Sequence, residues 1–174
     1  INTYYRRESE NKSTLNLEAT VVTRNNFRSD VAVENRERQE IIVPSEGSDK
    51  SDLYVFKVWG NCRLWNGSLE IGAEGTRTIN KQIYITKNQD MLFLRNTITE
   101  VKQNALSTYV SYSKNWKHLS ANVGLRHEYV SYDYFLNGEK DVYDDYHNFF
   151  PSISVSYRKD KFAVSFSHRT TFIR

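Results

Sequence analysis

Apolar and polar side chains alternate with a period of two along most of this 174-residue chain. Between Leu119 and Leu125 the apolar residues occupy every second position, with Ser, Asn and Gly between them. The same pattern recurs at Leu69–Ala73, Ile153–Tyr157 and Phe162–Phe166. Successive side chains of a β-strand point to opposite faces of a sheet, so each segment predicts a strand with one apolar and one polar face.

Composition supports this interpretation. The chain contains 12 Tyr, 9 Phe and 3 Trp but only 2 Pro, and aromatic residues fit the pleated, half-buried surface of a sheet. No stretch approaches the roughly 18 consecutive apolar residues of a transmembrane helix. A net charge of +3 and a mean hydropathy of −0.68 suit a soluble protein. They equally suit a membrane barrel, because every second residue of such a barrel points into a wet lumen.

We therefore predict an all-β fold, an antiparallel up-and-down meander of about eight strands that forms a transmembrane β-barrel or part of one. Residues 1–174 are predicted to be a single β-barrel segment. The predicted strands lie near 14–24, 27–35, 52–65, 68–78, 104–115, 118–133, 149–158 and 161–172.

The connections between these strands differ in length. Tight turns are predicted at Asn25-Asn26, Asn66-Gly67, Trp116-Lys117 and Lys159-Asp160, and long polar loops at 36–51, 79–103 and 134–148. Short and long connections thus alternate. Outer-membrane barrels have short periplasmic turns and longer extracellular loops, so the alternation favours such a barrel.

The two faces predict two environments. Charged residues on the polar face are candidates for the lumen: Lys57, Arg63, Glu70, Glu74, Arg126 and Glu128. Apolar residues of the other face are candidates for contact with lipid: Leu69, Ile71, Leu119, Val123, Leu125, Ile153, Val155, Phe162, Val164 and Phe166. Trp65, Trp116, Tyr129 and Tyr132 are candidate interfacial aromatics. A soluble sheet explains the same residues differently, with the charges in water and the rings in a sandwich core.

The sequence gives little sign of chemistry at a site. Cys62 is the single cysteine, the four histidines lack metal-ligand spacing, and no acid–base or nucleophile motif is recognisable. We predict that the chain is not an enzyme and has no catalytic residues, cofactor or metal. The basic residues are spread along the chain, so nucleic acid is not an expected partner. Ile1 is not an initiator Met and no signal peptide follows it, so we expect a segment of a larger protein.

Three stretches resemble the C-terminal barrel repeats of TonB-dependent receptor-like outer-membrane proteins. They are residues 105–129, 148–157 and 164–169, with Gly-Leu-Arg-x-Glu at 124–128 and Phe-Pro-Ser at 150–152. The resemblance is specific over residues 68–174. It implies a large barrel with an N-terminal plug that takes up nutrients with energy supplied through TonB. The chain has too few strands for that barrel and no plug of its own.

The leading hypothesis is therefore a structural wall of a receptor barrel whose long extracellular loops help to capture nutrients. The expected location is the outer membrane of a Gram-negative bacterium. The expected partners are outer-membrane lipid, the remaining barrel strands and plug domain, and, by resemblance, the TonB system. An isolated chain is expected to associate with itself through exposed edge strands. Two alternatives are a complete eight-stranded outer-membrane barrel with ligand- or adhesion-binding loops, and a soluble β-barrel or sandwich binding module.

Overall fold

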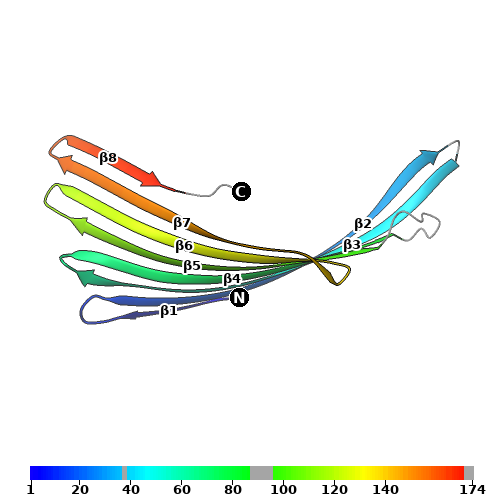
Figure 1. The fold of residues 1–174 in the computed structure, drawn as a ribbon, viewed down its shortest axis with the longest axis horizontal. Helices are drawn as coiled ribbons and strands as arrows, with labels where there is room; N and C mark the ends of the chain where they lie inside the picture. The colour runs from blue at the N-terminus through cyan, green and yellow to red at the C-terminus, as the bar shows by residue number, and fades with distance from the viewer. Residues whose placement is uncertain (37–38, 87–95, 171–174) are drawn as a thin grey trace.

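A computed structural model places the chain in one antiparallel sheet of eight strands (Figure 1). The structure describes residues 1–36, 39–86 and 96–170. The strands are β1 (Asn2–Glu8), β2 (Thr14–Arg36), β3 (Gln39–Leu64), β4 (Gly67–Thr86), β5 (Thr97–Asn115), β6 (Leu119–Leu136), β7 (Glu139–Lys159) and β8 (Phe162–Arg169). Each strand pairs with its neighbours in sequence, in the order β1 to β8. The predicted all-β antiparallel meander is confirmed.

The eight strands are not the eight that were predicted at the N-terminal end. The predicted strands 14–24 and 27–35 form one strand, β2, and the predicted turn at Asn25-Asn26 is wrong. Asn25 pairs with Lys50 and Asn26 with Asp49, so β3 accompanies β2 through this point. β1 was not predicted, because its polar and aromatic residues show no alternation.

The predicted long loops are mostly strand. Residues 39–51 belong to β3, residues 79–86 to β4 and residues 97–103 to β5. Residues 134–136 end β6, and residues 139–148 begin β7. Their polar residues on both faces were interpreted as loop, but a strand in water needs no apolar face once its backbone groups are paired. Parts of two predicted loops, at 37–38 and 87–95, and the predicted strand end at 171–172 lie outside the described residues.

The tight turns have left-handed backbone, mostly at Asn, Asp or Gly, with Trp65 as an exception. Trp65 and Asn66 form the turn between β3 and β4, with φ of 48° and 60°, one residue before the predicted Asn66-Gly67. Asn137 and Gly138, with φ of 53° and 89°, join β6 to β7 inside a predicted loop. Positive φ at both central residues is the type I′ geometry of two-residue hairpins. The last turn lies at 160–161 and includes Asp160 at φ 49°.

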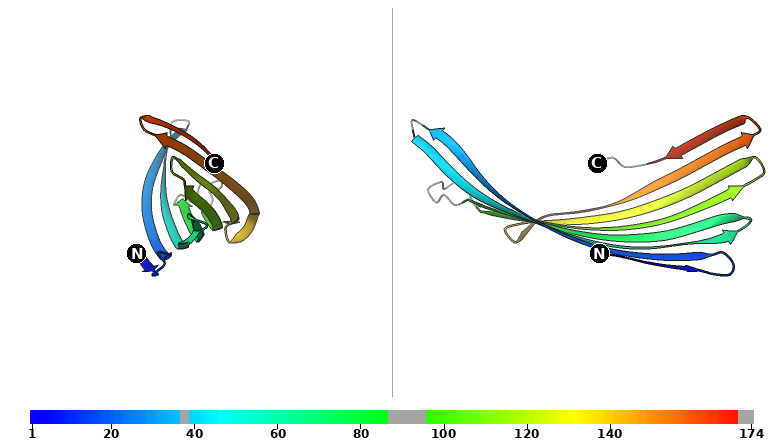
Figure 2. Two further views of the ribbon diagram at one scale, coloured as in Figure 1. Left: turned by 90° about the vertical axis from the view of Figure 1, so that its left-hand side faces the viewer. Right: turned by 180° about the vertical axis from the view of Figure 1, so that it is seen from behind.

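The sheet is curved and open. Viewed along its long axis it forms an arc (Figure 2), and β1 and β8 lie at its two margins. Within the described residues β1 contacts β2 alone and β8 contacts β7 alone. A complete eight-stranded barrel requires β1 to pair with β8. That alternative therefore has no support in the described part of the chain.

The sheet is a single layer. Among the described residues, Val43 and Val130 are the only buried hydrophobic side chains. A soluble sandwich would bury one face of this sheet under a second sheet. The described strands all belong to the one sheet, so nothing in them covers either face. The described part of the chain therefore gives the sandwich form of the soluble-module alternative no support.

Candidate functional site

The register gathers the six predicted lumen residues on one face of the sheet, which we call the polar face. Lys57 pairs with Glu74, Glu74 with Ser107, and Ser107 with Glu128. Directly opposed residues point to the same side, so these side chains form one row across β3 to β6. Arg63, Glu70 and Arg126 lie an even number of residues from members of the row and share its face.

The ten predicted lipid-facing residues all lie on the opposite face, which we call the apolar face. Ile71 pairs with Val110, Val110 with Leu125, and Leu125 with Pro151. The other members follow by the same alternation: Leu69, Leu119, Val123, Ile153, Val155, Phe162, Val164 and Phe166. Phe162 and Phe166 are 66% and 62% exposed, so large apolar side chains stand uncovered on this face. Contact with lipid remains a prediction for these residues.

The polar face is the sheltered one. The buried side chains of the described residues, apart from glycine, are Asn16, Val43, Ser45, Ser107 and Val130. All of them share the side of the sheet that carries Glu74 and Arg126. A curved sheet shelters its concave side and exposes its convex side, so the polar face is the inner one.

The apolar face has a definite extent along the strands. On β6 its positions are apolar or aromatic from Leu119 to Tyr129, and on β7 from Tyr157 to Phe149. This matches the roughly 9–11 residues that a tilted strand needs to cross a bilayer. Beyond it polar and charged residues interrupt the same face, at Asp52, Arg77, Asn104 and Asp133. We call the apolar portion the apolar band.

The strands continue well past the band. β3 has 26 residues and β7 has 21, about twice what the band requires. All of the excess lies at one end, opposite the turns at Trp65-Asn66 and 116–118. In Figure 1 the paired ends of β2 and β3 reach farthest from the turns. The predicted asymmetry between the two ends is therefore present, with extended strands in place of long loops.

The structure separates the predicted interfacial aromatics. Trp65 and Trp116 lie at the turn end, 78% and 49% exposed. Tyr129 lies on the apolar face at the far border of the band. Tyr132 lies on the polar face, where its hydroxyl donates to Asp144 at 3.3 Å. That parity argues against an interfacial position for Tyr132.

Sequence reasoning missed an aromatic cluster around Tyr129. The His147 ring lies 4.7 Å from Tyr129 and 5.3 Å from His127, and His127 lies 4.7 Å from Phe149. One ring nitrogen of each histidine meets the other at 3.1 Å. Counting parity back from the apolar positions of β6 and β7 would have found these residues, because all four share that parity.

The polar row holds its charges in pairs. The Lys57 ammonium lies 3.8 Å from the Glu74 carboxylate and 5.1 Å from the centre of the Trp59 ring. The Arg126 guanidinium donates to Glu128 at 2.6 Å and to Ser107 at 3.0 Å. These contacts order the row without exhausting its hydrogen-bonding capacity, because a carboxylate accepts several bonds and a guanidinium has five donors.

Two cavities hollow the polar face. One of about 490 Å³ lies over the row and is lined by Glu74, Gln103, Ser107, Arg126 and Glu128, among others. A second of about 460 Å³ lies beyond the band, where β2 to β5 extend, and its lining includes the polar-face residues Arg24, Asp49, Ser51, Asn80 and Gln82. Polar and charged groups in both could bind a polar solute, a plug or water.

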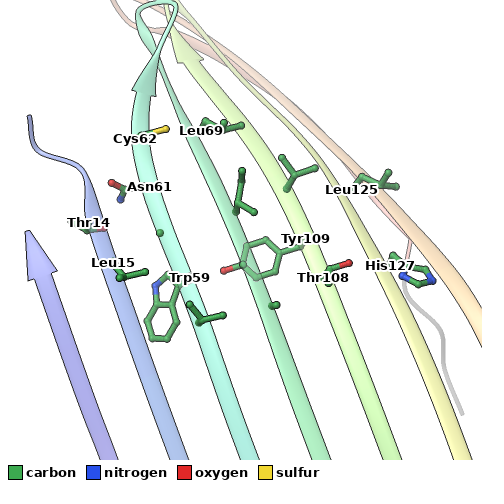
Figure 3. A pocket seen from close by; sticks show the side chains of 16 residues that line it. Thr14, Leu15, Trp59, Asn61, Cys62, Leu69, Thr108, Tyr109, Leu125 and His127 are labelled. Atoms are coloured by element: carbon green, nitrogen blue, oxygen red, sulfur yellow. The ribbon is translucent and has the colours of Figure 1, made fainter.

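Two depressions also mark the apolar face. The larger, of about 670 Å³, is bordered by Leu15, Leu69 and Leu125 from β2, β4 and β6 (Figure 3). Its lining includes Gly60 and Ala73, which have little or no side chain. The smaller, of about 480 Å³, lies farther along the same strands around Gly75. Their apolar linings suit a hydrocarbon chain better than a polar ligand.

Ionisable groups beyond the band are shifted by their neighbours. The hydrogen bond from Thr23 is the main cause that holds the pKa of Asp52 below its usual value, and Lys50 adds to it. A hydrogen bond with Tyr129 is the main cause that raises the pKa of Tyr143 to about 12. Within the described part of the chain, no three His, Cys, Asp or Glu side chains gather as metal ligands would. The described residues also contain no helix of the length and apolarity needed to cross a bilayer.

Several solved receptor barrels contain the same fold. The chain superposes on the unliganded ferric citrate transporter FecA with a TM-score of 0.70 at 10% identity, and on the ferric yersiniabactin uptake receptor FyuA from Yersinia pestis with 0.69 at 10%. FpvA of P. aeruginosa, bound to heterologous pyoverdines, gives 0.66 at 13% identity. The matches cover 92%, 92% and 95% of this chain but 25% of each receptor. At such identities the likeness shows the fold, and the chain spans a quarter of each neighbour's length.

The family is shown by sequence. No curated protein matches the chain significantly. The model of the outer membrane protein beta-barrel family matches residues 6–173, nearly the whole chain. The predicted resemblance to outer-membrane receptor barrels is thereby confirmed. The chain belongs to the outer membrane protein beta-barrel family and resides in the outer membrane of a Gram-negative bacterium.

Proposed function

We propose that this chain forms part of the wall of a TonB-dependent receptor barrel that captures and takes up a nutrient. One observation carries the proposal: the strands remain paired well past the apolar band, at one end only. The band fits the bilayer, and the extensions project from it. In outer-membrane barrels the larger projections are extracellular, so the extensions of β2 to β7 would face the medium.

The size of the match supports a wall rather than a whole receptor. The match covers a quarter of each receptor chain that the sheet resembles. A large barrel needs further strands beside β1 and β8, and a lumen that wide needs a plug. The remaining strands, the plug domain and the TonB system are accordingly the proposed partners.

The polar face is proposed as the lumen wall. Its paired charges, Lys57 with Glu74 and Arg126 with Glu128, offer hydrogen bonds to a plug or a passing solute. The second polar cavity lies among the extensions, where a nutrient would arrive first. The proposed role is capture and passage, without catalysis.

A labelling experiment tests the orientation of the wall. In the full barrel, with Cys62 replaced by Ser, single cysteines at Asn122 and Val123 would be treated with a water-soluble maleimide. Asn122 is on the polar face and its neighbour Val123 is on the apolar face, so they are a matched pair. We expect Asn122→Cys to react and Val123→Cys to be protected by lipid. Equal labelling of both positions would contradict the proposal.

An uptake experiment tests transport. A deletion strain would be compared with its parent for growth on single nutrients, including the ferric chelate class named for the structural neighbours. We expect at least one nutrient to be lost in the deletion strain and in a strain without TonB, and to return with the intact gene. Growth defects independent of TonB would leave the barrel as a wall without the proposed transport.

A further inference from the structure

Positive charge gathers on the outward side of the sheet immediately beyond the apolar band. Lys50, Arg77, Lys81 and Lys102 share the parity of the apolar face, on β3, β4 and β5. The carboxylates Asp52 and Glu100 lie on the same face of these strands, so four cations stand against two anions. Arg77 is the first residue of that parity after Gly75, the last position of the band on β4. We call these four cations the basic patch.

Two cations of the basic patch, Arg77 and Lys81, have no ion pair among the described residues. Lys50 pairs directly with Lys81 across β3 and β4, and like charges in this position destabilise a sheet, although Lys81 also lies directly opposite Glu100 on β5. Lys50 has an ion pair with Asp52 at 3.2 Å, and Lys102 with Glu100 at 3.4 Å. Arg77 and Lys81 are both exposed. An anion from outside the chain would relieve this repulsion.

The excess of positive charge on this face is confined to β3, β4 and β5. On the neighbouring strands β6 and β7 the same face and level carry the carboxylates Asp133, which lies directly opposite Lys102, and Asp145. β2 contributes the uncharged Thr23 and Asn25 at this level. A general excess of positive charge would not stop at the edges of β3 and β5.

An apolar groove leads directly to the basic patch. The lining of the depression of about 480 Å³ around Gly75 includes Val21, Phe56 and Leu106, and also Arg77 of the basic patch. A Cβ built on Gly75 meets no atom within 4 Å, so the floor of the groove is open. The larger depression continues the apolar surface along β4 toward Leu69.

We propose that this surface is a binding site for one anionic lipid of the leaflet on the side of the strand extensions. Its acyl chain lies in the groove at Gly75, and its phosphate lies against Arg77 and Lys81. Lipid is the occupant because hydrocarbon surface and cationic surface meet here at the border of the band, as they do in a lipid molecule. The site lies on the face opposite the proposed lumen, so it is independent of the transported nutrient.

Titration of the purified full barrel with dimyristoyl phosphatidic acid, followed by native mass spectrometry, tests the site. A cation near a membrane surface contributes about five-fold in affinity, so Arg77→Ala should weaken binding about five-fold and the double variant R77A/K81A about 30-fold. Arg24→Ala is the matched control, since Arg24 lies at the same level on the polar face. It should leave lipid affinity unchanged. Equal losses in R24A and R77A would overturn the proposal.

A second variant tests the groove separately. Gly75→Phe fills it and leaves every charge in place, so it should weaken binding of the dimyristoyl lipid about 10-fold, the equivalent of roughly two methylene groups returned from apolar contact. Dimyristoyl phosphatidylcholine should bind weakly to all variants. Inorganic phosphate should not compete at the concentrations where the lipid saturates. Full competition by phosphate would show an ion site, and unchanged binding in G75F would remove the groove from the proposal.

Discussion

The most constrained single residue of the wall is Gly72. Its pairing partner on β5 is Tyr109, and a Cβ built on Gly72 would collide with the Tyr109 ring. A ring packed over a cross-strand glycine covers backbone that would otherwise be bare. We therefore expect Gly72→Val to destabilise the folded barrel by about 1–3 kcal/mol, because overpacking forces the ring to move. The loss of stability can be measured by unfolding the barrel in urea and monitoring the folded fraction by its gel mobility.

Gly75→Ala is the control for that change. It introduces a Cβ on the same strand, where no atom lies within 4 Å, and should leave stability nearly unaltered. If Gly72→Val and Gly75→Ala have equal effects, the Tyr109 contact has no special role.

Tyr143 offers a residue-scale prediction about pH. Its pKa is raised to about 12, so the folded protein holds the phenol proton more tightly than an unfolded chain with a pKa near 10. The extra stability is fully present below about pH 10 and is lost as the pH rises through about 12. The difference in tyrosinate absorbance between the native protein and Tyr143→Phe should therefore titrate near 12. A midpoint near 10 would contradict the hydrogen bond with Tyr129.

At the scale of one strand, β6 allows a direct comparison of the two faces. Arginine on the lipid side near the middle of a bilayer costs about 2–4 kcal/mol, whereas a lumen position tolerates it. We expect Val123→Arg to destabilise the folded barrel by that amount and Asn122→Arg to have little effect. Refolding into lipid vesicles at increasing urea concentration measures both. Equal losses would mean that the faces are not assigned as proposed.

The sequence predicted strands correctly wherever one face of the strand had to be apolar. In β6 and β7 the alternation from Leu119 and from Ile153 located strand and face together, because lipid or core demands a period of two. It failed at Asn25-Asn26 and in 36–51, since these stretches have no continuous apolar face and their polar residues are also those of loops. There the pairing of β2 with β3 decides, and single-strand composition does not encode a partner 25 residues away.

The exact position of a turn was harder to predict from sequence than its existence. Asn66-Gly67 has the composition of a hairpin turn, yet the register places Trp65 and Asn66 at the positive-φ positions. Tyr112, whose hydroxyl donates to the carbonyl oxygens of Leu64 at 3.1 Å and of Trp65 at 3.3 Å, lies against Gly67 and holds that register. Faces of the candidate site were thus predictable from parity. The ion pairs, the aromatic cluster and the grooves depend on register and required the structure.

At the scale of the whole molecule, the two open edges of the sheet determine whether the isolated segment associates with itself. β1 and β8 each have one paired neighbour among the described residues, so each presents unpaired backbone groups on its other side. We expect this segment, produced without the rest of the barrel, to associate or aggregate in detergent. Light scattering after size exclusion would measure it. A monodisperse monomer would contradict the expectation.

The strand extensions determine how rigid a surface this wall presents to ligands outside the cell. β2 and β3 stay paired residue by residue out to Arg36 and Gln39, so the outermost part of this wall is a stiff ribbon. A flexible loop must become ordered when it binds a ligand, and the entropy lost in that ordering slows and weakens binding. A paired ribbon is ordered before binding. A nutrient, antibody or phage would therefore bind a preformed surface, at an association rate set by diffusion and electrostatic attraction.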